Sequence, residues 1–167
     1  MAVSDHIVDA FAGRVRSRVC GITIINNSIL LINHKGLNEQ NEWWAPPGGG
    51  VMLGETLSQA LIREFKEETG LCIKVNHFQF ITEYIQDPLH AIELFFQVDV
   101  IEGELKTGVD PELSLDKQSI NEVKYVTFEE LAIIPNEFKH LCLRGITDGI
   151  QLLSEKGYLH NQDKNIK

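Results

Sequence analysis

The sequence of 167 residues predicts a single mixed α/β domain, because stretches with strand-like patterning lie on both sides of one amphipathic helix. Asn26-Asn27 lies between two apolar stretches and is typical of a tight hairpin turn. Asp87-Pro88 separates two longer apolar stretches in the same way. This order of elements predicts helices that flank a mixed sheet. The predicted strands are residues 18–25, 28–34, 73–85, 91–100 and 122–126.

The chain divides into a short amphipathic N-terminal segment, residues 1–17, a domain at residues 18–155 and a C-terminal tail at residues 156–167. Two helices are predicted after the last strand of the domain. The first is a short capped helix at residues 127–131, and the second is a longer helix at residues 137–155.

The predicted helix that follows the glycine-rich turn carries three carboxylates on one face. At about 100° per residue, Glu64, Glu67 and Glu68 fall within a sector about 100° wide. On its own, such a row is equally typical of a solvated helix face, since like charges cost little there. Crowded carboxylates are also typical of a divalent-metal site, where a cation neutralises them.

Both ends of this helix can be read from the sequence. Thr56 and Gln59 predict a capping box at its start, and Gly70 predicts a left-handed turn at its end. Ala60 lies among the carboxylates and is expected to leave room for ions above the helix. The apolar stripe predicted to be buried beside the acidic face consists of Leu57, Leu61 and Phe65.

The surrounding pattern decides between the two interpretations of the carboxylates. Gly49 is followed after five residues by Glu55, and after seven more by Arg63-Glu64-Phe65-Lys66-Glu67-Glu68-Thr69-Gly70-Leu71. This pattern resembles the Nudix box, the signature of the Nudix hydrolases, at every fixed position and every spacing. The one loose fit is Phe65, which is larger than the aliphatic residue usual there.

The resemblance implies a Nudix α/β/α sandwich with a mixed sheet across residues 18–154. It implies hydrolysis of a nucleoside diphosphate linked to a further group X, giving a nucleoside monophosphate and phospho-X. The implied cofactor is Mg²⁺ or Mn²⁺, because hard cations prefer oxygen ligands and neutralise phosphate charge.

The resemblance also implies roles for particular residues. Arg63 and Glu55 are expected to form an ion pair that orients the ligands and supports catalysis, with a purely structural salt bridge as the alternative. The implied metal ligands are Glu64, Glu67, Glu68 and the backbone carbonyl of Gly48.

The general base stays open at this stage, because members of the family differ in its source. Glu64 in the box is one candidate. Glu112, on a polar loop predicted to be mobile at residues 102–119, and Glu122, at the start of the next strand, are the others. Glu122 is also expected to be an additional metal ligand.

Three residues are candidates for substrate binding. Trp43 is expected either to stack on a base or to pack in the core, whereas Trp44 matches a family position that is usually structural. Pro88 lies close to where members that hydrolyse ADP-ribose carry a proline, and Tyr84 is similar to a position in dinucleoside polyphosphate hydrolases. Both also have plain structural interpretations. ADP-ribose or a nucleotide sugar is slightly favoured over nucleoside triphosphates.

Composition limits the partners. The formal net charge of −9 argues against broad binding to nucleic-acid polymers, whose affinity comes largely from Lys and Arg. A small-molecule nucleotide remains the expected partner, and a homodimer stays open. A binding module that senses a nucleotide without cleaving it is the alternative function, although the intact acidic box favours an enzyme.

The cellular location is predicted to be cytoplasmic. Cys20, Cys72 and Cys142 show no paired metal spacing and are expected to be free thiols in a reducing compartment. Asp5 and Asp9 interrupt the apolar N-terminal run, so no secretory signal is predicted. No apolar stretch is long enough to cross a membrane.

Overall fold

The computed structural model describes residues 5–109 and 118–160. Its helices are α1 (Asp5–Phe11), α2 (Leu57–Thr69), α3 (Phe128–Ile133) and α4 (Gly149–Ser154), with short 3-10 helices η2 (Asn136–Phe138) and η3 (Leu141–Leu143). Its strands are β1 (Val15–Ile22), β2 (Ile24–Ile25), β3 (Ser28–His34), β4 (Trp43–Ala45), β5 (Gly48–Gly50), β6 (Cys72–Gln86), β7 (Leu89–Glu102), β8 (Ile120–Thr127) and β9 (Gly157–Leu159).

The strands form two sheets, one of which is mixed. The larger sheet has the order β5-β1-β7-β6-β9, and the smaller one joins β2, β3 and β4, with β8 pairing β3. In the larger sheet, β1 runs parallel to β7 and antiparallel to β5. The predicted mixed sheet is therefore confirmed. The glycine strand β5 lies at its edge, next to β1.

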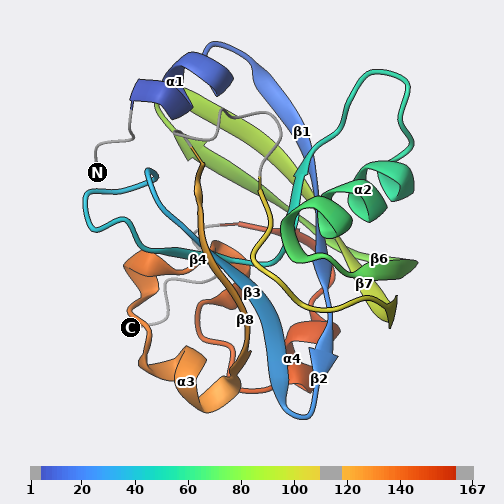
Figure 1. The fold of residues 1–167 in the computed structure, drawn as a ribbon. Coiled ribbons are helices and arrows are strands. Elements are labelled where there is room, and N and C mark those ends of the chain that lie inside the picture. Colours follow the sequence, from blue (N-terminus) through green and yellow to red (C-terminus); the bar gives the residue numbers. More distant parts are fainter. Residues whose placement is uncertain (1–4, 110–117, 161–167) are drawn as a thin grey trace.

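Two apolar layers hold helices against the strands. Consecutive residues of β3 serve opposite layers, because side chains alternate along a strand: Leu30 packs in the cluster that contains Phe65 of α2, and Leu31 in the cluster that contains Phe128 of α3. Figure 1 shows α2 beside β1 and the β6–β7 pair, with α3 and α4 at the other end of the molecule from α1. The strands thus lie between two helical layers.

The two predicted turns are confirmed. Asn26 and Asn27 both adopt positive φ angles, 49° and 58°, as the tight hairpin between β2 and β3 requires. The long strands β6 and β7 pair antiparallel around Asp87-Pro88, from Gln86 opposite Leu89 onward.

Both predicted ends of α2 are confirmed. The Thr56 hydroxyl accepts from the Gln59 N–H at 3.2 Å, and the Gln59 side chain accepts from the Thr56 N–H at 2.9 Å. Gly70 ends the helix with a φ of 75°. The helix is thus fixed by local residues at both ends.

The buried stripe of α2 differs in part from the prediction. Leu57 is 36% exposed, whereas Ala60 is fully buried in the core. Phe65 is fully buried, and it fits because residue 21 is glycine: a Cβ there would lie 2.4 Å from the Phe65 ring. The large residue at this box position is therefore accommodated by β1.

The predicted long helix at residues 137–155 is wrong. Only short helical pieces form there, because Lys139 is extended and forms a β-bridge with Trp44 of β4. The His140 N–H donates to the Trp44 carbonyl at 2.8 Å, and the imidazole then caps η3 by accepting from the Cys142 N–H. A long-range contact overrides the local helical pattern at this point.

Both ends of the described chain join the fold. β9 pairs parallel with β6 through residues 157–159, and β1 begins at Val15, three residues before the predicted start. The N-terminal α1 buries Ile7. Among the described residues, no helix combines the length and apolar character needed to span a membrane.

Candidate active site

The acidic face of α2 and the glycine strand β5 form one side of a pocket. Glu64 and Glu68 line it and are only 6% and 5% exposed. The pocket has a volume of about 110 Å³, several times the roughly 10–15 Å³ that holds one water molecule. It therefore has room for a multi-atom ligand beside two buried carboxylates.

The glycines of β5 permit this close approach. Gly48 has a φ of 152°, and a Cβ there would lie 2.0 Å from the Val19 carbonyl oxygen. At Gly49 a Cβ would lie 2.3 Å from the carboxylate carbon of Glu64. The Gly48 N–H donates to Glu68 Oε2 at 2.8 Å. At residue 48 only glycine fits, because the clash is with backbone, whereas at residue 49 a larger residue would displace the Glu64 carboxylate.

Arg63 ties the acidic residues together. Its Nε and Nη2 donate to the two carboxylate oxygens of Glu55 at 2.7 and 2.9 Å, and Nη2 also donates to the Gly50 carbonyl at 3.0 Å. Its Nη1 donates to Glu64 at 2.8 Å and to Glu67 at 3.1 Å. The predicted ion pair of Arg63 with Glu55 is present. The same guanidinium also contacts Glu64 and Glu67, which are two of the predicted metal ligands.

The pKa shifts follow from burial and from Arg63. Burial raises the pKa of Glu64, against the opposing hydrogen bond and charge of Arg63. The hydrogen bond from Arg63 lowers the pKa of Glu55 to about 2. Glu55 is therefore ionised at neutral pH, whereas Glu64 is held closer to the titration range of a proton acceptor.

The oxygen atoms at this site suit a hard divalent cation, although they are not arranged as a complete coordination shell. Carboxylate and carbonyl oxygens are the ligands that Mg²⁺ and Mn²⁺ prefer. Within residues 5–109 and 118–160, however, no three His, Cys, Asp or Glu side chains converge closely enough to hold a metal ion. Arg63 neutralises Glu64 and Glu67, and Arg18 donates to the Gly48 carbonyl at 3.3 Å. A cation would have to replace these contacts.

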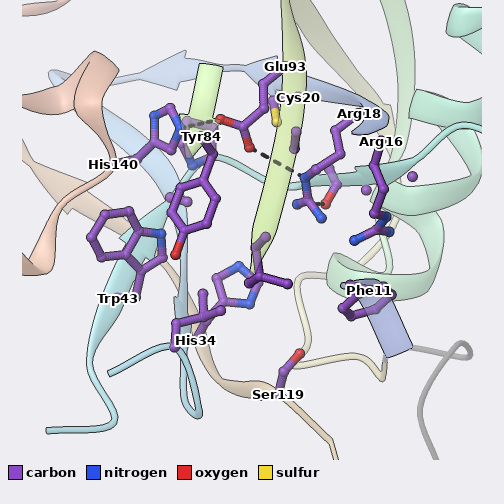
Figure 2. Close-up of a pocket in the computed structure, with 18 of the residues that line it drawn as sticks. Phe11, Arg16, Arg18, Cys20, His34, Trp43, Tyr84, Glu93, Ser119 and His140 are labelled. Carbon is purple, nitrogen blue, oxygen red and sulfur yellow. Dashed lines mark hydrogen bonds and ion pairs between the residues drawn. The ribbon is translucent and has the colours of Figure 1, made fainter. Parts of the chain in front are cut away.

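A buried charge network, missed by the sequence analysis, forms another part of the pocket. Arg18 and Glu93 lie directly opposite each other on β1 and β7, with Arg18 Nε 3.4 Å from Glu93 Oε1. His140 Nε2 donates to Glu93 Oε2 at 2.6 Å, and the Thr82 hydroxyl donates to the same oxygen at 3.2 Å. Figure 2 shows Arg18 and His140 on either side of Glu93.

The environment of Glu93 keeps it charged. Burial alone would raise the pKa of Glu93, but His140, Arg18 and Thr82 together lower it to about 2. The signal available in the sequence was a charged residue flanked by apolar ones in a predicted strand, Glu93 between Ile92 and Leu94. A charge at such a position is expected to be paired or functional.

The residues predicted to bind substrate lie in different parts of the structure. Trp43 and Tyr84 line the pocket, with ring centroids 6.1 Å apart and planes at 73°. Trp44 is buried in the core, where its Nε1 donates to Glu42 at 3.0 Å. Pro88 is exposed in the β6–β7 turn and does not line the pocket. The structure therefore brings two of the three candidates to the site.

Of the two later glutamates, only Glu122 lies among the described residues. Glu122 on β8 does not line the pocket, its side chain is 45% exposed, and its Oε2 lies 3.3 Å from Lys124 Nζ. Glu112 lies outside the described residues. Glu122 as a ligand and Glu112 as a base stay predictions.

These observations define an α/β/α protein whose pocket lies between the glycine strand β5 and the acidic helix α2. The protein-family model of the NUDIX domain matches residues 15–143 of this chain, which include every element of that pocket side. The chain belongs to the Nudix family.

Two curated relatives show how far sequence similarity extends. The ADP-ribose pyrophosphatase of Methanocaldococcus jannaschii is 46% identical over 94 residues, which cover 55% of this chain and 55% of that protein. The RNA pyrophosphohydrolase of Orientia tsutsugamushi (strain Boryong) is 40% identical over 50 residues, 30% of this chain and 31% of that protein. The chain thus spans about half or less of the length of these relatives.

A solved structure supports the fold. The NUDIX hydrolase from Nitrosomonas europaea superposes with a TM-score of 0.59 at 17% sequence identity, covering 71% of this chain and 76% of that chain. At this identity the similarity is one of fold.

Proposed function

We propose that this chain is a divalent-metal-dependent hydrolase that cleaves the phosphoanhydride bond of a nucleoside diphosphate linked to a group X. The observation that carries the proposal is the placement of Glu64 and Glu68, nearly buried on α2, against the backbone of β5 inside a pocket. Buried carboxylates next to space for a ligand are costly in a protein unless they serve a cation or a reaction.

Glu64, Glu67, Glu68 and the Gly48 carbonyl are the proposed ligands, and Mg²⁺ or Mn²⁺ the proposed cation. When bound, such an ion supplies Lewis-acid polarisation of the phosphoryl oxygens and neutralises their charge. The chain itself prepares the ligand oxygens: Arg63 fixes Glu64 and Glu67, and the Gly48 N–H fixes Glu68.

Glu64 is the proposed general base. Its carboxylate lines the pocket, and its raised pKa brings it closer to the range in which a side chain can take a proton from an attacking water. Arg63, hydrogen-bonded to Glu64 Oε1 at 2.8 Å, favours the ionised form that a base needs.

Arg18 is proposed to offset phosphate charge near β5. Its guanidinium lies between Glu93 and the Gly48 carbonyl and lines the same pocket as the carboxylates. A planar guanidinium with several donors is suited to phosphate oxygens.

ADP-ribose or a nucleotide sugar is the proposed substrate class. The support is the 46% identity to the M. jannaschii ADP-ribose pyrophosphatase together with pocket-lining aromatic side chains. The acidic net charge of −9 makes an RNA polymer a weaker proposal. We also propose that the protein acts in the cytoplasm.

A substrate screen tests the proposal. Purified protein is incubated with ADP-ribose, nucleotide sugars, dinucleoside polyphosphates, nucleoside triphosphates and 5′-triphosphorylated RNA, with Mg²⁺, with Mn²⁺ and with EDTA. Release of a nucleoside monophosphate from ADP-ribose or a nucleotide sugar, abolished by EDTA and restored by metal, is expected. Binding of a nucleotide without cleavage of any compound would instead support a sensing module.

A further inference from the structure

The N-terminal helix α1 contributes to the pocket although it precedes the region that the family model matches. The family match begins at residue 15, whereas α1 spans Asp5–Phe11. Ile7 and Phe11 both line the pocket. What α1 adds to the site therefore comes from outside the region that the family model matches.

Packing fixes α1 against pocket residues. Ile7 and Leu89 form a buried cluster on which Phe11, Leu37 and Tyr84 pack. The Arg16 guanidinium lies over the Phe11 ring, 3.8 Å from its centroid, an arrangement in which a cation and an aromatic face attract each other. Phe11 is thus held in place from two sides.

His34 is a second unexplained group in the pocket. Its imidazole lines the cavity and has no hydrogen-bond partner among the described residues, whereas its backbone belongs to the ladder of β3 with β4 and β8. No fully buried side-chain nitrogen or oxygen of the described residues lacks a partner, so the unpartnered nitrogens of this pocket-lining imidazole are accessible rather than sealed in the core. The structure gives His34 a place at the site but no internal role.

His34 is neutral at physiological pH. Burial and the nearby charge of Arg18 lower its pKa to about 3. A neutral imidazole offers one hydrogen-bond donor and one acceptor. It therefore suits a polar uncharged edge better than a phosphate.

Aromatic walls lie around this imidazole. Trp43 pairs with His34 in the strand register of β3 and β4, and Trp43 meets Tyr84 nearly edge-on. Figure 2 shows His34 between the Trp43–Tyr84 pair on one side and Phe11 on the other. Flat apolar walls with one donor and one acceptor match a heteroaromatic ring, whose faces are apolar and whose edge is polar.

We propose that α1 completes a nucleobase subsite in which Phe11, Trp43 and Tyr84 flank the ring and His34 hydrogen-bonds to its edge. This proposal rests on the proposed function, which puts a nucleotide in the pocket. It assigns the nucleoside to the end near α1 and His34, and the phosphates to the end near β5 and α2.

The two products expected from ADP-ribose, AMP and ribose 5-phosphate, test the subsite without requiring turnover. Binding of each to the full-length chain is measured by NMR titration. His34→Ala should weaken AMP binding by about tenfold and ribose 5-phosphate binding by less than twofold, because one hydrogen bond to the base is lost. His77→Ala, an exposed histidine outside the pocket, should change neither.

Substitutions of Phe11 test the contribution of α1. Phe11→Ala should weaken AMP binding several-fold, whereas Phe11→Tyr, which keeps the ring, should bind like the wild type. Phe78→Leu is the matched control, since this partly exposed ring packs on Phe96 outside the pocket.

The outcomes separate the two proposals. Selective loss of AMP binding in a protein that hydrolyses no nucleotide would keep the subsite and reject the proposed function. Equal losses for AMP and ribose 5-phosphate, unchanged AMP binding in both His34→Ala and Phe11→Ala, or no AMP binding by the wild type would overturn the subsite.

Discussion

Gly49 and Glu64 lie so close together that any side chain at residue 49 would occupy the position of the Glu64 carboxylate, with a Cβ only 2.3 Å from its carboxyl carbon. With glycine at residue 49, the Glu64 carboxylate lies directly against β5 at the pocket wall. Burial at this position raises the pKa of Glu64. The glycine strand and the acidic helix are therefore one functional unit.

Gly49→Ala should displace Glu64 and lower turnover by about 100-fold, because small displacements of catalytic groups are costly. Turnover on the substrate found in the screen, together with the midpoint of thermal unfolding, measures the effect. Gly54→Ala is the control: a Cβ there meets no atom, but its φ of 91° strains the backbone. That variant should lose stability and keep turnover, and a fully active Gly49→Ala would refute the role of this contact.

Arg63→Lys should lower turnover by roughly tenfold or more, because lysine cannot reproduce the planar fork that reaches Glu55, Glu64 and Glu67 together. The free energy of unfolding, measured by urea denaturation, should fall by about 1–2 kcal/mol. Arg14→Lys, an exposed arginine that bonds only to the Ala10 carbonyl among the described residues, should change neither quantity. Wild-type turnover in Arg63→Lys would show that the network is only structural.

Local residues explain why part of this fold could be predicted. The caps of α2 depend on Thr56, Gln59 and Gly70, all within one turn of the helix ends, and the hairpin depends on Asn26-Asn27. Short-range hydrogen bonds and backbone preferences decide such features, so the sequence pattern is sufficient for them.

Long-range contacts explain what could not be predicted. The predicted helix at residues 137–155 is interrupted because the His140 N–H pairs with the distant Trp44 carbonyl. In the site, the Nudix box was enough to predict Glu64 and Arg63. The Arg18–Glu93 pair could not be predicted, because it depends on the parallel register of β1 and β7. His34 reaches the pocket through strand pairing in the same way, without any motif around it.

Glu93→Gln should destabilise the protein by about 3 kcal/mol at pH 7, because Arg18 and His140 lose a buried ionised partner. The pKa of Glu93 is lowered from 4.5 to about 2 in the fold, so its stabilising effect is complete above about pH 4.5 and lost as the pH falls toward 2. Urea denaturation at pH 7 and at pH 3 should therefore show a smaller difference between variant and wild type at pH 3.

Glu102→Gln serves as the control for that comparison, since Glu102 is exposed on the same strand β7. It should match the wild type at both pH values. A difference between Glu93→Gln and wild type that is the same at pH 7 and pH 3 would contradict the ionised network.

Glu64→Gln and Glu122→Gln compare two predicted roles directly. Glu64→Gln should lower turnover by about 100-fold or more, because it removes both a ligand charge and the proposed base. Glu122→Gln should lower turnover far less, since Glu122 is exposed, lies beside Lys124 and does not line the pocket, and a measurable loss would support its predicted role as an additional ligand. A crippled Glu122→Gln with an active Glu64→Gln would reverse these assignments.

The turnover of Glu67→Gln at saturating Mg²⁺, on the substrate from the screen, tests most directly whether the acidic face of α2 acts through a cation. Gln keeps the shape and helix propensity of Glu67 and removes one ligand charge, so turnover should fall by about 100-fold or more. The free energy of unfolding in EDTA should stay within about 1 kcal/mol of wild type, since the surface ion pair with Arg63 is worth little. Near-wild-type turnover, or wild-type activity that persists in EDTA, would contradict the account.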